Sequence, residues 1–335
     1  MTIRWKMLLA ALVLAGVSGH AVGQINDFYR GKVLTIIMPN SPSASMMRYA
    51  RMIAPYIAKY SGVREVRINN IRGAGGLIGT NTLWHAKPDG FTIAFTSVPA
   101  LLLAQLSGSE GVQFDATKFV YLGRVSHEPR VFAVGGNSDI KTIQDLHKRN
   151  RPFIFPTQGT DEDFYTMAVL ADALGFELKA VTGYEGNADT ALAVIKGDGN
   201  GHITAWSASL PAIKAGDKRP ILTIGSVRFP EYPDVPTVLE VVPSEKQAAV
   251  RAIVNMLEMH RGFFGPPKMD PQAVIALRAA IKSALNDPEL QAEAKKNNLP
   301  LDPADGAAEQ AQLEQIARAS ANIVPILKAA LKSIR

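Results

Sequence analysis

Three serines at alternate positions, Ser41, Ser43 and Ser45, form the first group of side chains suited to hold a ligand. They lie on a predicted turn between an apolar strand at 34–38 and a helix at 46–60. In an open parallel sheet such a turn faces the ligand crevice. Hydroxyls beside the unpaired N–H groups of a helix N-terminus hold a carboxylate well, because the donors and the positive end of the helix dipole point to one place. The loop predicts an anion site, and ordinary helix capping explains it equally well.

A second loop of the same kind lies between a predicted strand at 153–155 and a predicted helix at 162–174. Its residues are Thr157, Gln158, Gly159 and Thr160. One such anion-binding loop, or cradle, in each half of the chain would allow the two halves to close on a single carboxylate. Ordinary helix capping is again an equally good explanation of this loop. The acidic run 161–163 that follows is typical of a solvated helix start. We expect it to point outward, because acids in the cleft would repel a second carboxylate by about 1 kcal/mol or more at ~4 Å.

A glycine-rich stretch, Gly73–Gly79, superficially matches the dinucleotide fingerprint. The preceding segment 64–70 is too polar for a buried Rossmann strand, and the loop is not the first strand-to-helix turn. A turn that docks a helix tightly is the favoured interpretation, and a nucleotide-cofactor enzyme is the less favoured alternative. The histidines lack ligand spacing, and the chain has no cysteine and no nucleophile elbow. The sequence therefore predicts no catalytic residue, no metal site and no cofactor.

Residues 1–23 have the order of a cleavable signal peptide. Arg4 and Lys6 precede an apolar run about half as long as the ~20 residues needed to cross a bilayer, and small residues ending at Gly23 suit cleavage there. We expect export to the periplasm. Removal of this segment leaves a net charge of about +4, with basic residues spread along the chain. That balance suits anionic small molecules and argues against nucleic-acid binding.

Apolar runs of strand length alternate with helical patterns along about 310 mature residues. This alternation predicts an α/β fold of two lobes, each a mostly parallel sheet flanked by helices. The last third of the chain is predicted to be helical. Asp270 followed by Pro271, and Asp287 followed by Pro288, are helix start signals. Pro325 is predicted to kink the last helix.

Several motifs resemble the tripartite tricarboxylate transporter receptor family, also called TctC or Bug receptors, over nearly all of the mature chain. The most specific are 70–79, which resembles N-x-x-G-A-G-G-x-x-G, and 88–92, which resembles P-D-G-Y-T. Further matches are Gly183–Gly186, Ala212–Gly216, Pro233–Thr237 and Phe263–Pro267. The resemblance implies a type II-like periplasmic-binding-protein fold with C-terminal helices packing across the lobes. We place residues 24–128 and 245–335 in lobe 1 and residues 129–244 in lobe 2.

One departure from the family pattern concerns the ligand. The family's first loop, P-G-G-x-x-D-x-x-A-R, aligns with Pro42–Arg51, and Met47 stands where the family has aspartate. Because an aspartate is the natural counter-charge for an ammonium group, we expect a di-, tri- or aromatic carboxylate without an amino group. Trp206 is expected either as an apolar wall of the pocket or, equally, as a core residue. The candidate ligand-binding residues that the resemblance implies are Asn40, Ser41, Ser43, Ser45, Met47, Thr96, Ser97, Thr157, Gln158, Gly159, Thr160, Asp161, Tyr184, Gly186, Asn187 and Trp206.

The function implied by these patterns is capture of a small organic acid by lobe closure. The acid would pass unchanged to the membrane subunits of a tripartite tricarboxylate-type transporter. We expect a monomer without enzymatic activity. A periplasmic carboxylate sensor that signals through a membrane receptor is an alternative that the sequence does not separate from transport.

Overall fold

The first lobe is built on one sheet, and the computed structural model describes residues 28–39 and 45–334 of the chain. Within these residues the sheet has six strands in the order β11-β4-β10-β3-β1-β2. The strands are β1 (Val33–Met38), β2 (Glu65–Asn70), β3 (Thr92–Ser97), β4 (Val120–Ser126), β10 (Arg261–Gly265) and β11 (Ala304–Asp305). β1 pairs in parallel with β2 and β3, whereas β10 runs antiparallel between β3 and β4.

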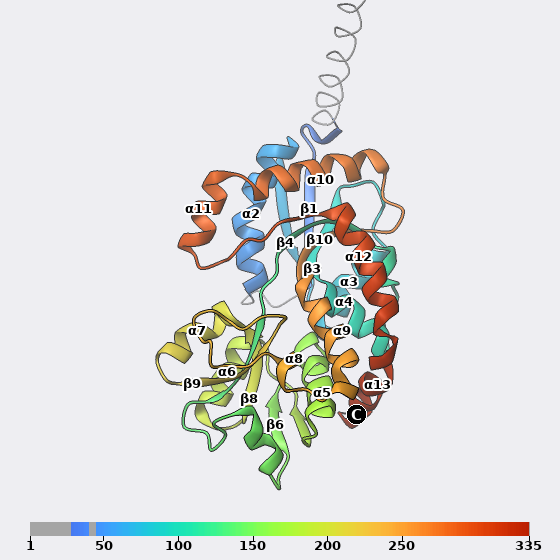
Figure 1. The fold of residues 1–335 in the computed structure, drawn as a ribbon. Helices are drawn as coiled ribbons and strands as arrows, with labels where there is room; N and C mark the ends of the chain where they lie inside the picture. Colours follow the sequence, from blue (N-terminus) through green and yellow to red (C-terminus); the bar gives the residue numbers. More distant parts are fainter. Residues whose placement is uncertain (1–27, 40–44, 335) are drawn as a thin grey trace, which may run out of the picture.

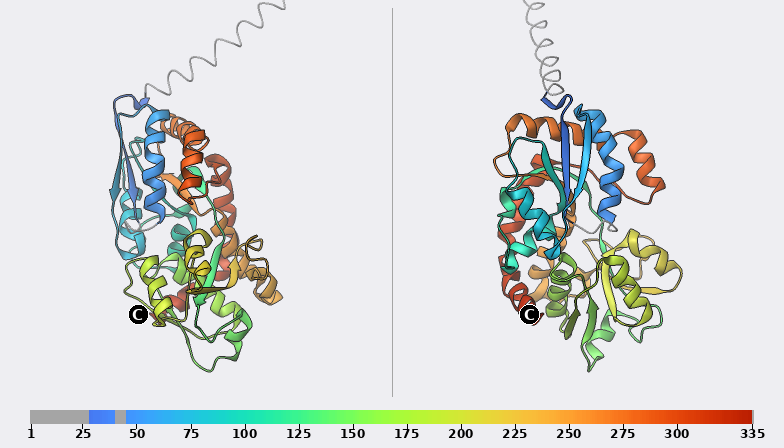
Figure 2. Two further views of the ribbon diagram at one scale, coloured as in Figure 1. Left: turned by 90° about the vertical axis from the view of Figure 1, so that its left-hand side faces the viewer. Right: turned by 180° about the vertical axis from the view of Figure 1, so that it is seen from behind.

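Helices pack around this sheet, as two opposite views show (Figures 1 and 2). They are α2 (Ser45–Ser61), α3 (Leu77–Trp84), α4 (Val98–Ser107), α10 (Pro271–Leu285) and α11 (Pro288–Lys296). α10 packs against α2. Asp270 caps α10 and Asp287 caps α11, each with a proline in the first turn, which confirms both predicted start signals.

The burial of β1 and β2 explains why their sequences differ. In β1, Leu34 and Ile36 belong to the core that α2 and α10 share, while Ile37 belongs to the core on the other face. β2 is an edge strand, and its side chains alternate between exposed and half-buried. The polarity at 64–70 that argued against a Rossmann strand therefore belongs to a sheet edge.

The second lobe contains two smaller sheets. Its strands are β5 (Arg130–Gly135), β6 (Phe153–Pro156), β7 (Leu178–Val181), β8 (Gly201–Ala205) and β9 (Lys218–Ile224). β5 lies antiparallel between β8 and β9, and β6 pairs in parallel with β7. The helices in this part of the chain are α5 (Glu162–Leu174), α6 (Asn187–Lys196), α7 (Trp206–Lys214), α8 (Val238–Val241) and α9 (Gln247–Glu258). The lobe boundaries at 128/129 and 244/245 stay a prediction.

The α/β fold of two lobes is confirmed, but the strand directions are more mixed than the alternating pattern predicted. β5 and β10 are the first strands after the chain has crossed from one lobe to the other. Each begins at the junction of the lobes and runs away from it, whereas β3 and β8 end there and continue into a helix. A strand that enters a sheet from that end must run antiparallel to such neighbours.

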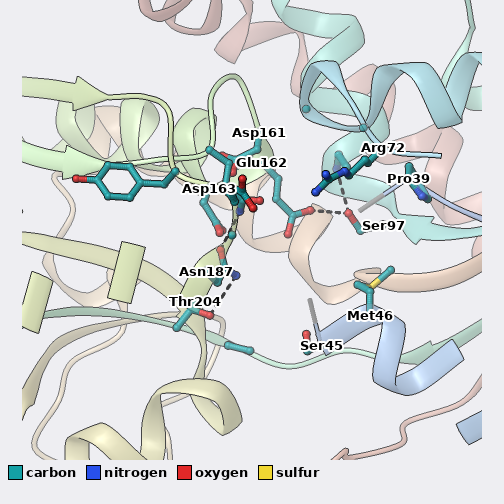
Figure 3. A pocket seen from close by; sticks show the side chains of 18 of the residues that line it. Pro39, Ser45, Met46, Arg72, Ser97, Asp161, Glu162, Asp163, Asn187 and Thr204 are labelled. Carbon is teal, nitrogen blue, oxygen red and sulfur yellow. Dashed lines mark hydrogen bonds between the residues drawn. The ribbon is translucent and has the colours of Figure 1, made fainter. Parts of the chain in front are cut away.

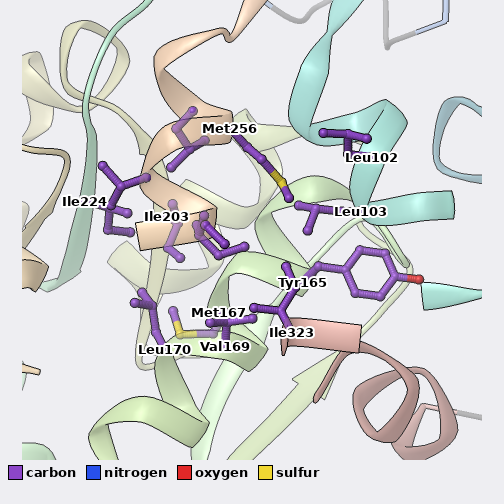
Figure 4. Packing of buried hydrophobic residues seen from close by; sticks show 14 of the residues in the cluster. Leu102, Leu103, Tyr165, Met167, Val169, Leu170, Ile203, Ile224, Met256 and Ile323 are labelled. Atoms are coloured by element: carbon purple, nitrogen blue, oxygen red, sulfur yellow. The ribbon is translucent and has the colours of Figure 1, made fainter. Parts of the chain in front are cut away.

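One hydrophobic core extends from the first lobe into the second (Figure 4). Leu102 and Leu103 of α4 lie in one cluster with Tyr165 of α5 and Met256 of α9. α12 (Gly306–Ala319) and α13 (Val324–Ser333) follow, and α13 packs against both α4 and α5. The prediction that C-terminal helices pack across the lobes is confirmed. Because close-packed side chains resist displacement, movement of the lobes has to preserve this packing.

Pro325 does not kink the last helix, contrary to the prediction. It lies in the first turn of α13, after a short 3-10 segment, Ser320–Ile323, that follows α12. A proline is tolerated in the first turn of a helix, where its missing N–H would have had no intrahelical partner. Pro325 therefore starts a helix.

Two groups of predicted features lie outside the described residues. These are the signal peptide at 1–23 and the loop residues Asn40, Ser41 and Ser43. In the part of the chain that the structure describes, no helix combines the length and the apolar character needed to cross a membrane.

Candidate ligand-binding site

A cavity of about 270 Å³ lies where the two lobes meet (Figure 3). The first lobe lines it with residues that include Ser45, Arg72 and Ser97, and the second lobe with residues that include Gln158 and Tyr184. Its volume is close to the lower end of the ~300–1,000 Å³ typical of ligand pockets. A small molecule held between the lobes would fill it.

Helix N-termini converge on this cavity. Among the described residues, six helices have a lining residue at their first position or just before it: α2 (Ser45), α3 (Gly76), α4 (Ser97), α5 (Asp161), α6 (Gly186) and α7 (Ala205). A helix N-terminus carries N–H groups without an intrahelical partner and the positive end of a helix dipole. Backbone from both lobes thus attracts negative charge to one place.

Side chains of the protein cap some of these helices and leave two others uncapped. Ser97 Oγ accepts a hydrogen bond from Ala100 N at the start of α4, and Asp161 Oδ1 accepts one from Phe164 N at the start of α5. By contrast, α3 follows Gly76 and α6 follows Gly186 without a side-chain cap. These two helices belong to different lobes. Because Leu77 N and Ile78 N at the start of α3 donate to Ala74 O and Gly73 O, a ligand would meet the backbone of the turn before α3 rather than the first N–H groups of that helix.

The glycine-rich loop before α3 serves close approach of backbone to backbone. A Cβ on Gly79 would lie 2.4 Å from the Ile71 carbonyl oxygen, so only glycine lets this helix dock. That confirms the predicted role of the stretch as a tight docking turn. Gly75 has φ +65°, and a Cβ there would lie 3.3 Å from the Thr160 carbonyl oxygen of the second lobe. The loop therefore contacts the opposite lobe as well as lining the cavity.

Glu162 joins the two lobes at the cavity. Its Oε2 accepts a hydrogen bond from Ser97 Oγ at 2.5 Å, and its Oε1 forms an ion pair with Arg130 Nη2. Arg130 Nη1 lies 3.0 Å from Asp163 Oδ1. Arg130 and Asp163 are buried, so their charges are compensated inside the protein.

His260 completes this cluster from the first lobe. Burial, followed by the nearby charges of Arg130 and Arg261, holds the pKa of His260 well below its usual range. The ring is therefore neutral near pH 7, and its Nε2 lies 2.7 Å from Arg130 Nη2 and 2.9 Å from Glu162 Oε1. The imidazole of His260 and the carboxylate of Glu162 thus both contact the Arg130 guanidinium.

The expectation that the acidic run 161–163 points outward was wrong. All three residues line the cavity, and Figure 3 shows their carboxylates gathered on one side of it. The general rule for helix starts applies to an isolated helix, whose first turn faces water. Here β5 and α4 pack against the start of α5 and supply Arg130 and Ser97, which hold the acids inside.

Asp161 has the most perturbed carboxyl group of this run. Burial, with the neighbouring Asp163 as the second cause, raises the pKa of Asp161 from 3.8 to about 7. Hydrogen bonds from Phe164 N at 2.9 Å and Thr157 Oγ1 at 3.3 Å stabilise the ionised form, but they do not outweigh the burial.

Asp161→Asn is expected to stabilise the protein at pH 8 by about 1 kcal/mol, because it removes a charge next to Asp163 and keeps a good N-cap residue. Wild-type Asp161 retains its proton in the folded state between pH 4 and 7, where the unfolded state has lost it. Its contribution to stability therefore falls as the pH rises through this range. The advantage of the variant should nearly vanish at pH 4. Urea denaturation at pH 4, 6 and 8 measures it, and a variant less stable than wild type at pH 8 contradicts the prediction.

A second buried arginine, Arg261, lies at the start of β10. Its Nη1 is 3.2 Å from Ser126 Oγ and 3.7 Å from Glu128 Oε2, and its guanidinium lies over the Tyr49 ring at 4.8 Å. Glu128 also accepts hydrogen bonds from the backbone N (2.5 Å) and the Oγ (2.9 Å) of Ser207 at the start of α7. Glu128, on the connection between β4 and β5, thereby ties an arginine of the first lobe to a helix of the second.

Of the residues predicted from the sequence, seven of those that the structure describes line the cavity: Ser45, Ser97, Gln158, Asp161, Tyr184, Gly186 and Asn187. Gln158 Nε2 donates to Asn187 Oδ1 at 3.0 Å, which joins the predicted second loop to the start of α6. Of the four residues of the predicted second cradle, only Gln158 lines the cavity.

Other predicted residues do not line the cavity. Met47 is 3% exposed and packs in the core of the first lobe, because α2 turns this position toward the sheet. Trp206 is fully buried and stacks on Phe229 at 4.3 Å, so it is a core residue of the second lobe. The remaining positions outside the lining are Thr96, Thr157, Gly159 and Thr160; Thr157 supports the loop by donating to Gly159 O and Asp161 Oδ1.

Sequence reasoning missed Arg72, Arg130, His260 and Arg261, which all line the cavity. Arg72 lies in the motif at 70–79, whose glycines were interpreted as a helix-docking turn. Arg130 and Arg261 are the first residues of the two strands that follow a crossing between lobes. The first position of a strand that follows such a crossing must lie at the junction of the lobes. A charged residue at that position of an otherwise apolar strand could therefore have indicated a cavity residue.

The chain matches the tripartite tricarboxylate transporter family receptor over residues 49–330. Protein BugT of Bordetella pertussis is 24% identical over 287 residues, which cover 84% of each chain.

Solved structures share the fold. The periplasmic binding protein BugD superposes with a TM-score of 0.73 at 20% identity, covering 89% of this chain and 98% of that one. MatC from Rhodopseudomonas palustris with bound malate has a TM-score of 0.71 at 18% identity, covering 88% and 99%. With the family match spanning most of its length, the protein belongs to the tripartite tricarboxylate transporter receptor family.

Proposed function

We propose that this protein is an exported periplasmic receptor that binds a small organic acid reversibly between its lobes and delivers it to the membrane subunits of a tripartite tricarboxylate transporter. The observation that carries the proposal is the convergence of helix N-termini from both lobes on one cavity, with α3 and α6 uncapped. Such termini bind carboxylates without a dedicated cationic side chain. Membership of a receptor family and the malate held by the related MatC fold support the same ligand class.

In this mechanism the ligand carboxylate accepts hydrogen bonds from backbone N–H groups of the glycine-rich turn before α3, which lines the cavity, and from the first N–H groups of α6. Exposed Arg72, next to the start of α3, adds a positive charge at the cavity. The side chains of Ser97, Gln158 and Asn187 supply further polar contacts. Because the donors belong to different lobes, binding favours the closed arrangement, which a membrane partner would then distinguish from the open one.

The proposal predicts that carboxylates, and no nucleotide cofactor, raise the melting temperature of the exported protein. A panel of di- and tricarboxylates, aromatic acids and amino acids, with NAD and NADP, tests this by thermal shift. A ligand at 100 times its dissociation constant stabilises by about 2.7 kcal/mol. Arg72→Gln is expected to weaken binding about tenfold, whereas Arg64→Gln, an exposed arginine that does not line the cavity, should leave it unchanged. A response to NAD alone, or to no acid of the panel, contradicts the proposal.

Transport is tested in cells once a ligand is known. Deletion of the gene is expected to abolish high-affinity uptake of the radiolabelled acid, and deletion of the transporter membrane subunits should have the same effect. Unchanged uptake with a lost transcriptional response to the acid would instead support a sensor.

A further inference from the structure

Lys218, the first residue of β9, is a buried lysine whose contacts are a histidine and a serine. It is 3% exposed, and its Nζ lies 3.0 Å from His202 Nε2 and donates a hydrogen bond to Ser209 Oγ at 2.8 Å. The residues of β5 opposite Lys218 and His202 are Gly135 and Ala133, which are small enough for the lysine chain to lie across the strand. Burial lowers the pKa of Lys218 to about 8, so the amine still carries its charge near pH 7.

The contact with Lys218 fixes the tautomer of His202. Burial, followed by the charge of Lys218, holds the pKa of His202 well below its usual range, so the ring is neutral near pH 7. A charged amine has only donors, so His202 Nε2 is the acceptor and the ring proton is on Nδ1. The side chain is 1% exposed, and its Nδ1 has no hydrogen-bond partner among the described residues. Because a buried N–H group without an acceptor is unfavourable, this donor requires an acceptor beside it.

His202 also lines a second, much smaller cavity. Its volume is about 10 Å³, close to the ~10–15 Å³ that one water molecule needs. Asp161, Asp163 and Asn187 line this cavity and the ligand cavity, so they form the wall between the two, and Figure 3 shows them together at the ligand cavity. A buried water needs two to four polar partners, which the imidazole and the two carboxylates supply.

We propose that one water molecule occupies the small cavity and links His202 to the first turn of α5, so that Lys218 and His202 are positioning residues of the ligand site. The water accepts a hydrogen bond from His202 Nδ1–H and donates to the carboxylates of Asp161 and Asp163. The ring and the water thereby connect the buried amine to these acids, and its positive charge favours the ionised form of Asp161. The consequence for ligand rests on the proposed function: Lys218 sets the pH range in which the cavity accepts an acid.

Other charged groups around Asp161 stay in place when Lys218 is replaced. Asp161 lies next to the charges of Asp163 and Arg130. The further titratable or charged residues that line the ligand cavity are Arg72, Glu162, Glu185, His260 and Arg261. Lys218 lines neither cavity, so its replacement alters none of these groups directly. Removal of the lysine charge therefore raises the pKa of Asp161, because the ionised form loses a source of stabilisation.

A high-resolution crystal structure and nitrogen NMR of the ligand-free exported protein test the geometry. An ordered water is expected within hydrogen-bond distance of His202 Nδ1 and of a carboxylate at the start of α5. Two-bond proton–nitrogen spectra of the histidine rings at pH 7 should show the proton of His202 on Nδ1. An empty cavity, or a proton on Nε2, overturns the inference. Either result leaves the proposed function standing, because no ligand takes part in the measurement.

Lys218→Met supplies the second readout, because it removes the charge and keeps an unbranched apolar chain. It is expected to raise the midpoint of the Asp161 titration, followed by NMR of its carboxyl carbon, by about half a pH unit or more. Lys179→Met, at an exposed lysine of β7 that lines neither cavity, is the matched control and should leave the midpoint unchanged.

The same variant tests the consequence for binding. Because Asp161 repels an acid only when it is ionised, the affinity of Lys218→Met for an acid identified by thermal shift should fall at a correspondingly higher pH than in wild type. An unchanged titration midpoint in folded Lys218→Met overturns the link between Lys218 and Asp161. If this variant does not fold, the tautomer of His202 in the wild-type protein decides the inference.

Discussion

Arg130→Met is expected to destabilise the protein by about 3–5 kcal/mol at pH 8, the penalty for removing one partner of a buried ionic network. The arginine is 4% exposed and contacts Glu162 and Asp163 at the start of α5 and His260 just before β10. Methionine fills a similar volume but leaves two carboxylates without a counter-charge. Urea denaturation of wild type and variant measures the loss.

Two further variants separate this network from a general effect of losing an arginine. Arg72→Met, at an exposed lining residue, should change stability by no more than about 0.5 kcal/mol. Adding Glu162→Gln and Asp163→Asn to Arg130→Met should recover at least about 1 kcal/mol, because the uncompensated charges are then removed. A loss below about 1 kcal/mol in the single variant, or no recovery in the triple variant, contradicts the network.

Trp206→Ala is expected to destabilise the protein by about 3–5 kcal/mol, as for other buried aromatic residues. The indole is fully buried and stacks on Phe229, at 4.3 Å and 7°, and on Tyr232, at 5.3 Å. Its Nε1 has no hydrogen-bond partner among the described residues, so Trp206→Phe loses packing without a hydrogen bond and should cost clearly less. Urea denaturation measures both variants.

The affinity of the folded Trp206→Phe variant decides between a core residue and a pocket wall. We expect the dissociation constant for the identified acid to stay within about threefold of wild type, because Trp206 does not line the cavity. Tyr184→Ala is the counterpart: Tyr184 lines the cavity and is half-buried, so this change should weaken binding and leave stability nearly unchanged. A large loss of affinity in Trp206→Phe would instead indicate that Trp206 forms part of the pocket wall.

Local structure followed closely from the sequence. The helix predicted at 162–174 and the strand predicted at 178–181 have the bounds of α5 and β7, and the helix predicted at 46–60 is α2 with one more residue at each end. Caps at Asp270 and Asp287 were read correctly because a cap depends on a few consecutive residues. Pro325 was misread because a kink and a helix start differ only in where the preceding helix ends.

The sequence predicted several residues of the cavity but not the charged residues that contact one another there. The sequence placed Ser97, Gln158 and Asn187 at a cleft, since residues that follow strands gather at one edge of a sheet. It did not reveal that Arg130 and His260, which lie 130 positions apart, meet at Glu162. No local pattern encodes such a meeting, because it depends on two crossings of the chain between lobes.

By itself, the sequence determined the α/β character, the helix starts and the family, because these depend on residues close together in the chain or on motifs of fixed spacing. The tertiary structure alone decided which charges face the cavity. Asp161, Glu162 and Asp163 would lie in water on an isolated helix, but β5 and α4 bring Arg130 and Ser97 against them. Because these contacts bury the first turn of α5 next to uncapped helix starts of both lobes, that turn lines the candidate binding site instead of facing water.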